Sequence, residues 1–89
     1  MACQIISYDL RKPGRNYDGL FDVIKSLGDW WHCLESVWIV HTSLTSGQIR
    51  DRVASSLDAN DKLLVAKLQG DWASRGLDQK CNNWLTGNL

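Results

Sequence analysis

The sequence predicts one small α+β domain, and three observations lead to that class. The chain has 89 residues, 44% of them hydrophobic, which suffices for one buried core and not for two. Short runs rich in β-branched residues alternate with stretches whose apolar residues recur at helical spacing. No internal repeat, linker or low-complexity stretch interrupts this alternation. We therefore expect a domain over residues 1–69, followed by a tail over residues 70–89 that packs on the domain or on a partner subunit.

The first strand and the first helix are marked by composition and by turn signals. Residues 3–10 form a short apolar, β-rich run, and a Pro-Gly pair at positions 13–14 signals the turn that follows it. Apolar residues then recur at helical spacing over residues 17–27, behind the suitable cap residue Asn16. Gly28 stands just past the last of them, as glycine does at many helix C-termini. The sequence predicts a buried strand followed by one amphipathic helix.

Three further segments complete the predicted secondary structure. Residues 31–42 combine Val, Ile and Trp with partial alternation, and they fit either one kinked strand or a hairpin. Thr45 followed by Gln48 has the form of a capping box, which predicts a second helix over residues 46–57. Residues 62–68 have the length and branching of a central strand. With both helices on one face of a mainly antiparallel sheet, this order predicts a split βαβ sandwich of the ferredoxin-like type.

Tryptophan content bears on the oligomeric state. Five tryptophans are many for so small a chain, and each carries a large area that favours burial. They are Trp30, Trp31, Trp38, Trp72 and Trp84. A small domain with this much aromatic surface often completes its core across a subunit interface, so we expect a homodimer. The alternative is that Trp30 or Trp31 stacks on a nucleic-acid base or lies in an interface with another protein.

Charge and cysteine content restrict the partners and the compartment. Ten basic residues balance ten acidic ones, so contacts with nucleic acid must come from a local cluster. Cys3, Cys33 and Cys81 are odd in number and form no CxxC pair, which indicates reduced thiols in the cytoplasm rather than a disulfide framework. No apolar run is long enough to cross a bilayer and no cationic leader is seen, so we expect no membrane partner.

The basic cluster is the segment over residues 11–15, which holds Arg11, Lys12 and Arg15 around a flexible turn. It lies just ahead of a helix N-terminus, which itself favours anions. These three residues are therefore the candidates for phosphate contacts, and the alternative is an ordinary solvated loop. Asp9 stands immediately before the cluster, where an aspartate often accepts hydrogen bonds from the amides of the following turn.

The order and spacing of several short motifs resemble a known family. The matching residues are Tyr8-Asp9, Gly28, Ser36-Val37-Trp38, Thr45, Gln48, Ile49, Asp61, Leu63 and Val65. Over about residues 4–68 the chain is similar to the second CRISPR-associated protein, the small dimeric partner of the spacer integrase, and to its VapD-type toxin relatives. It also resembles small phage and bacterial proteins labelled SinR-like.

The resemblance implies a metal-dependent endoribonuclease or other nuclease that acts in phage defence. In that family the aspartate matching Asp9 meets its symmetry mate at the dimer axis and holds a divalent metal, Mg²⁺ or Mn²⁺, that polarises a phosphodiester. Tyr8 and the basic cluster are then expected to contact RNA or DNA. The family's paired arginines are replaced here by a spaced set. The alternative is a non-catalytic phage or mobile-element accessory protein that binds a nucleotide or a protein partner.

Overall fold

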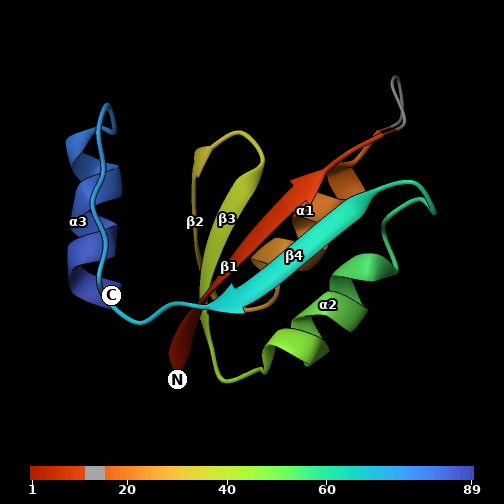
Figure 1. Ribbon diagram of the computed structural model, residues 1–89, viewed down its shortest axis with the longest axis horizontal. Coiled ribbons are helices and arrows are strands. Elements are labelled where there is room, and N and C mark those ends of the chain that lie inside the picture. Colours follow the sequence, from red (N-terminus) through yellow and green to blue (C-terminus); the bar gives the residue numbers. More distant parts are fainter. Residues whose placement is uncertain (12–15) are drawn as a thin grey trace.

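A computed structural model describes residues 1–11 and 16–89 of the chain. Its elements are β1 (Ala2–Asp9), α1 (Asp18–Lys25), β2 (Asp29–Leu34), β3 (Val37–Thr42), α2 (Ser46–Ala54), β4 (Lys62–Lys67) and α3 (Gln79–Asn88). The strands form one four-stranded antiparallel sheet in the order β2-β3-β1-β4 (Figure 1). The predicted α+β class and the antiparallel sheet are confirmed. The turn predicted at positions 13–14 lies outside the described residues, as do Lys12 and Arg15.

The segment that fitted either a kinked strand or a hairpin is a hairpin. β2 and β3 pair antiparallel, with Trp30 opposite Val40 and Leu34 opposite Val37. The register shifts between Trp31 and Leu34, so β2 is irregular near its centre. Because the hairpin supplies two strands, the core of the fold has the order β1-α1-β2-β3-α2-β4 before the tail begins.

α1 is shorter than predicted at both ends. The Asn16 side chain accepts a hydrogen bond from Asp18 N at 2.8 Å, but the N-cap position is Tyr17, whose side chain makes no capping bond. At the other end, Ser26 Oγ donates to Val23 O at 2.6 Å and so satisfies a carbonyl of the last turn. The helix therefore starts one residue later and ends two residues earlier than its apolar periodicity predicts.

Gly28 does not have the left-handed conformation of a helix C-cap glycine. Within the described chain, positive φ angles occur only at Gly70 and Gly76. A Cβ atom at Gly28 would instead lie 2.3 Å from the carbonyl oxygen of His41. Glycine is needed here because two backbone segments approach each other closely where the chain leaves α1 and enters β2.

The capping box predicted for α2 is confirmed. Thr45 Oγ1 accepts from Gln48 N at 3.2 Å, and Gln48 Oε1 accepts from Thr45 N at 2.9 Å. These reciprocal bonds satisfy donors that the first helical turn leaves free. α2 buries Ile49 and Val53, and it ends at Ala54, earlier than predicted. Leu57, just beyond the helix, still packs against the same core.

The two faces of the sheet carry separate apolar cores. The first lies beneath α1 and α2, which cover the same face, and its buried members are Ile6, Tyr8, Leu20, Ile24, Leu27, Trp38, Val40, Ile49 and Val53. The second lies on the opposite face, beneath the tail and α3, and its buried members are Cys3, Trp31, Ile39 and Leu85. Neighbouring residues of β3 divide between the two cores because side chains alternate along a strand.

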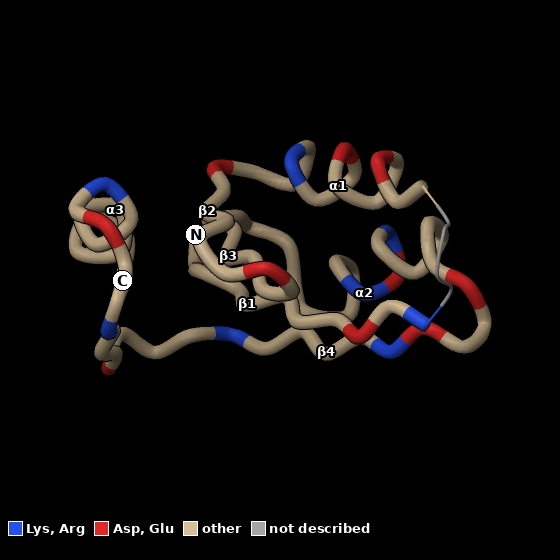
Figure 2. Tube along the Cα trace, turned by 90° about the horizontal axis from the view of Figure 1, so that it is seen from above, with Lys and Arg blue, Asp and Glu red and all other residues tan. Residues whose placement is uncertain are grey.

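The tail ends in α3, which lies beside the β2 edge of the sheet in both views (Figure 1, Figure 2). Cys33 of β2 and Cys81 of α3 form a disulfide, with their Cα atoms 6.3 Å apart, while Cys3 is free and buried. The expectation of three reduced thiols is therefore wrong. The paired cysteines are separated by 48 positions, and only the docking of α3 brings them together. No described helix, α3 included, is long and apolar enough to span a membrane.

Candidate functional site

The candidate site is at the end of β1, on the sheet face opposite α1 and α2. Ile6 and Tyr8 point into the first core, so the alternate residues of β1 face the other way. Pairing with β4 places Ala66 opposite Ile5, Leu64 opposite Ser7 and Lys62 opposite Asp9. We call the surface formed by these six side chains the open face. Leu64, near its centre, is 64% exposed.

Charged and polar groups gather at one end of the open face. A shallow pocket of about 220 Å³ is lined there by Ser7, Asp9, Lys62 and Leu64, among others. Figure 2 shows acidic and basic residues mixed at this end, where β1 stops and β4 starts. Arg11 Nη2 donates to Asp9 Oδ2 at 2.5 Å, and both side chains are more than half exposed. The contact seen for Asp9 is thus with a guanidinium group and remains open to solvent.

Asp61 anchors the backbone of this site. Its carboxylate accepts from Arg11 N at 2.6 Å, from Asp58 N at 2.8 Å and from Tyr17 Oη at 3.0 Å. These donors belong to the end of β1, the α2-to-β4 connection and the start of α1, so one side chain joins three segments. Asp61 was a landmark of the sequence resemblance, but its role as an anchor had no local signal. A lone aspartate ahead of a strand does not reveal distant donors.

Tyr8 is placed in the core rather than at the surface. It is 7% exposed, and its hydroxyl accepts from Trp38 Nε1 at 3.0 Å and donates to the carbonyl of Glu35 at 3.4 Å. Burial raises the pKa of the Tyr8 hydroxyl, and the bond from Trp38 offsets part of that shift. The hydroxyl is thus engaged by two residues of the chain, and the phosphate contact predicted for Tyr8 stays a prediction.

The two tryptophans predicted for stacking or interface contacts separate onto different faces. Trp31 is 5% exposed and donates through Nε1 to the carbonyl of Cys81 at 3.1 Å. Trp30 is 42% exposed, and the Lys25 ammonium lies 5.1 Å from its ring centroid. Through the pairing of the strands, Trp30 is level with Gln4, about 17 Å along β1 from the end of that strand. Trp30 and the Asp9 site are therefore separate surfaces.

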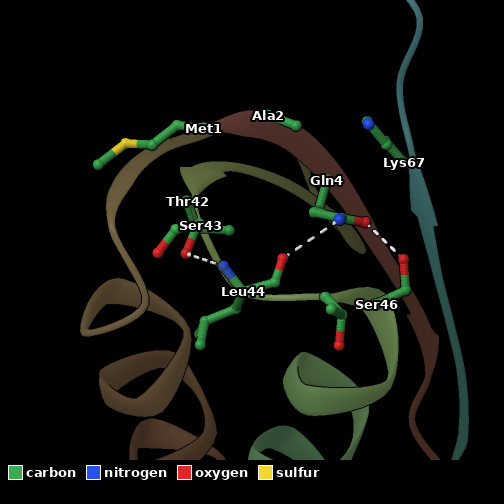
Figure 3. Close-up of a pocket in the computed structure, with 9 residues that line it drawn as sticks. Met1, Ala2, Gln4, Thr42, Ser43, Leu44, Ser46 and Lys67 are labelled. Carbon is green, nitrogen blue, oxygen red and sulfur yellow. Dashed lines mark hydrogen bonds between the residues drawn. The ribbon is translucent and has the colours of Figure 1, made fainter.

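A second pocket, of about 510 Å³, lies at the opposite end of the sheet beside the start of α2 (Figure 3). The buried Gln4 side chain accepts from Ser46 Oγ at 2.6 Å and donates to the carbonyl of Leu44 at 3.4 Å, while Thr42 Oγ1 accepts from Leu44 N at 3.2 Å. The exposed Lys67 adds a positive charge. Because these polar groups bond to one another, we interpret the network as the anchor of the β3-to-α2 connection.

An apolar groove of about 330 Å³ runs between the tail and the second face of the sheet. Its walls include Ile5, Val37 and Ile39 of the sheet, with Trp72 and Leu85 of the tail. Ile5 also belongs to the open face, so the groove and the open face adjoin. The tail therefore covers this side of the sheet over β2, β3 and the start of β1, and it covers less of the end of β1 and of β4.

Whether the chain can bind the predicted Mg²⁺ or Mn²⁺ depends on how many carboxylates lie close together. Within residues 1–11 and 16–89, no group of three or more His, Cys, Asp or Glu side chains is arranged to hold a metal ion. Asp9 alone is exposed at the predicted position, so a second carboxylate would have to come from another copy.

No protein-family model matches the chain, and no solved structure gives a significant match.

Proposed function

We propose that the chain is a homodimeric nucleic-acid-binding protein with a ferredoxin-like fold. The order β1-α1-β2-β3-α2-β4 and the sheet order β2-β3-β1-β4 support that fold. The observation that carries the function is Arg11, an exposed cation whose backbone N–H is held by the carboxylate of Asp61. An arginine whose backbone is held in place contacts a phosphate at a lower entropy cost than one whose backbone is not held.

The surroundings of Arg11 support a phosphate contact. Lys62 lies directly opposite Asp9 in the sheet, and the Ser7 hydroxyl lines the same pocket. Lys12 and Arg15 follow in the sequence and add two positive charges close to Arg11 along the chain. Since the chain has zero net charge, a local group of cations of this kind is what binding to a polyanion requires.

The open face supports the homodimer. Leu64 and Ile5 form an apolar surface beside the charged end, and an exposed leucine in the middle of the edge strand β4 is better buried than solvated. A two-fold axis through the apolar part of this face would pair Ile5 and Leu64 of each copy with the same residues of the other, and it would leave the two Asp9-Arg11 sites at the rim, on one side of the dimer. The dimer would then present a wider cationic surface than one copy does.

The test is binding of labelled single-stranded and double-stranded RNA and DNA, measured by fluorescence anisotropy over a range of salt. Arg11→Ala is expected to weaken binding severalfold and to reduce the salt slope by about one per subunit. Arg50→Ala is the matched control, because Arg50 is also an exposed arginine paired with a neighbouring aspartate. Equal losses in both variants, or binding that does not respond to salt, would contradict the proposal and favour a nucleotide or protein partner.

The second candidate function is metal-dependent cleavage of nucleic acid, which the exposed Asp9 carboxylate favours. It requires the dimer, since one copy supplies a single exposed carboxylate at this place. Bound Mg²⁺ or Mn²⁺ would polarise the phosphodiester, and Asp9 would hold the ion. Cleavage is expected with either metal, to be lost with a chelator or in Asp9→Asn, and to be lost in Leu64→Glu if that change yields monomers. Binding without cleavage would reject catalysis and keep the binding function.

A further inference from the structure

We propose that the Cys33–Cys81 disulfide is a redox-controlled latch, which holds α3 on the sheet when oxidised and releases it when a dithiol reductant opens the bond. The inference concerns the attachment of α3 and does not depend on the proposed nucleic-acid function. It would give the chain two states that differ in how much apolar sheet surface is covered.

The non-covalent attachment of α3 is slight. Leu85 is its one buried residue, Cys81 and Trp84 are half-buried against the same core, and two hydrogen bonds tie the helix to the sheet. Trp31 Nε1 donates to the carbonyl of Cys81 at 3.1 Å, and the Cys3 thiol donates weakly to the carbonyl of Asn88 at 3.3 Å. Trp72, Leu77 and other tail residues add apolar contacts at the same surface. Apart from the main chain, the disulfide is the one covalent bond from α3 to the rest of the described fold.

One buried polar group makes the docked state of α3 less stable than its apolar contacts alone would. Trp84 of α3 has a buried indole N–H, which finds no hydrogen-bond partner among the described residues. A buried donor without a partner has lost its water and gained nothing in return. Release of α3 would return this group to solvent, so the docked and released states are closer in free energy than the buried apolar area alone would indicate.

The sequence of α3 makes it dependent on docking. The helix spans ten residues, QKCNNWLTGN, and it contains two adjacent asparagines, a threonine and a glycine, all of which have low helix propensity. Helices of this length are marginal in water even when built from the best helix formers. Once the latch opens, α3 is therefore expected to lose its helical structure as well as its position.

The disulfide is reachable by a reductant. Cys33 and Cys81 both line a surface pocket of about 540 Å³ beside the β2 edge, together with Trp30, Lys80 and Trp84. A thiolate of the dithiol attacks one sulfur and forms a mixed disulfide, and the second thiol of the reagent then displaces the protein sulfur. The protein gains two electrons and two protons as Cys33 and Cys81 thiols, and the dithiol becomes a disulfide.

The Cys3 thiol can report the release of α3, because it lies on the surface that release would uncover. Cys3 is buried beneath Leu85 in the second core, with Trp31 and Ile39 around it. Burial raises the pKa of the Cys3 thiol, and the Asp29 carboxylate adds to that shift, so Cys3 should react slowly with alkylating agents while α3 is docked. Solvent access after release would increase that rate.

The experiment compares the oxidised full chain, the same chain reduced with dithiothreitol, and the double variant C33S/C81S. Alkylation of Cys3 by N-ethylmaleimide is followed by peptide mass mapping, and hydrogen exchange is measured over α3 and over β1 and β3. Reduction and the double variant are each expected to speed Cys3 alkylation at least tenfold and to remove exchange protection from α3, while β1 and β3 stay protected.

Three results would overturn the latch. The first is three free thiols in the protein purified without reductant. The second is equal protection of α3 and Cys3 in the oxidised and reduced chain. The third is loss of protection over β1 and β3 together with α3, which would make the disulfide a requirement of the whole fold. Reduction of the wild type keeps the test decisive where the double variant does not fold.

Discussion

The close approach at Gly28 predicts that one substitution has opposite effects at two glycines. In Gly28→Ala the new Cβ would lie 2.3 Å from the carbonyl oxygen of His41, about 1 Å inside an ordinary contact. The oxygen belongs to the backbone and the Cβ is bonded directly to a backbone atom, so neither can turn aside and the passage from α1 to β2 must move away from the end of β3. Overpacking of this kind costs about 1–3 kcal/mol, and the rigid partner places this case near 3 kcal/mol.

Gly19→Ala is the matched control, because Gly19 lies inside α1 and a Cβ there meets nothing within 4 Å. It should stabilise the chain by about 0.5–1 kcal/mol through helix propensity. Urea unfolding followed by tryptophan fluorescence measures the free energy of unfolding of both variants. In thermal unfolding of a domain of this size, Gly28→Ala should lower Tm by about 12–24 °C. A Gly28→Ala variant within about 0.5 kcal/mol of the wild type would refute the reasoning.

Three further effects on stability are expected, each measured by urea unfolding. Reduction of Cys33–Cys81 should lower the free energy of unfolding by up to about 4 kcal/mol, from the 48-residue separation that the bond spans; no change would show that the bond does not form in solution. Asp61→Ala should cost about 2–4 kcal/mol because several donors lose their acceptor, whereas the exposed Asp71→Ala should be neutral within about 0.5 kcal/mol. The raised pKa of Tyr8 means that its neutral form stabilises the fold below the ordinary pKa of about 10, and that this contribution is lost as the pH rises through the folded value. Wild type should therefore lose more stability than Tyr8→Phe between pH 9 and pH 12, and equal losses would contradict the burial argument.

Local sequence patterns determined the elements whose signals are local. The capping box of Thr45 and Gln48 predicted the start of α2 because both of its hydrogen bonds lie within four residues of chain. The branched run over residues 62–68 predicted β4 for the same reason, since strand propensity and length are read along the chain. Helix ends were less well predicted, because Ser26 and the residues after Ala54 make local bonds that periodicity does not encode.

Only the tertiary structure decided which distant groups meet. The sequence placed Asp9 and Arg11 at the end of a strand, but the anchoring of that end by Asp61 depends on three segments folding together. The pairing of Cys33 with Cys81 depends in the same way on where α3 docks, so counting cysteines pointed to the opposite conclusion. Composition and periodicity report each residue's preference for burial and for local conformation, whereas contacts across the sheet arise from the packing of whole elements and leave no signal in the neighbouring residues.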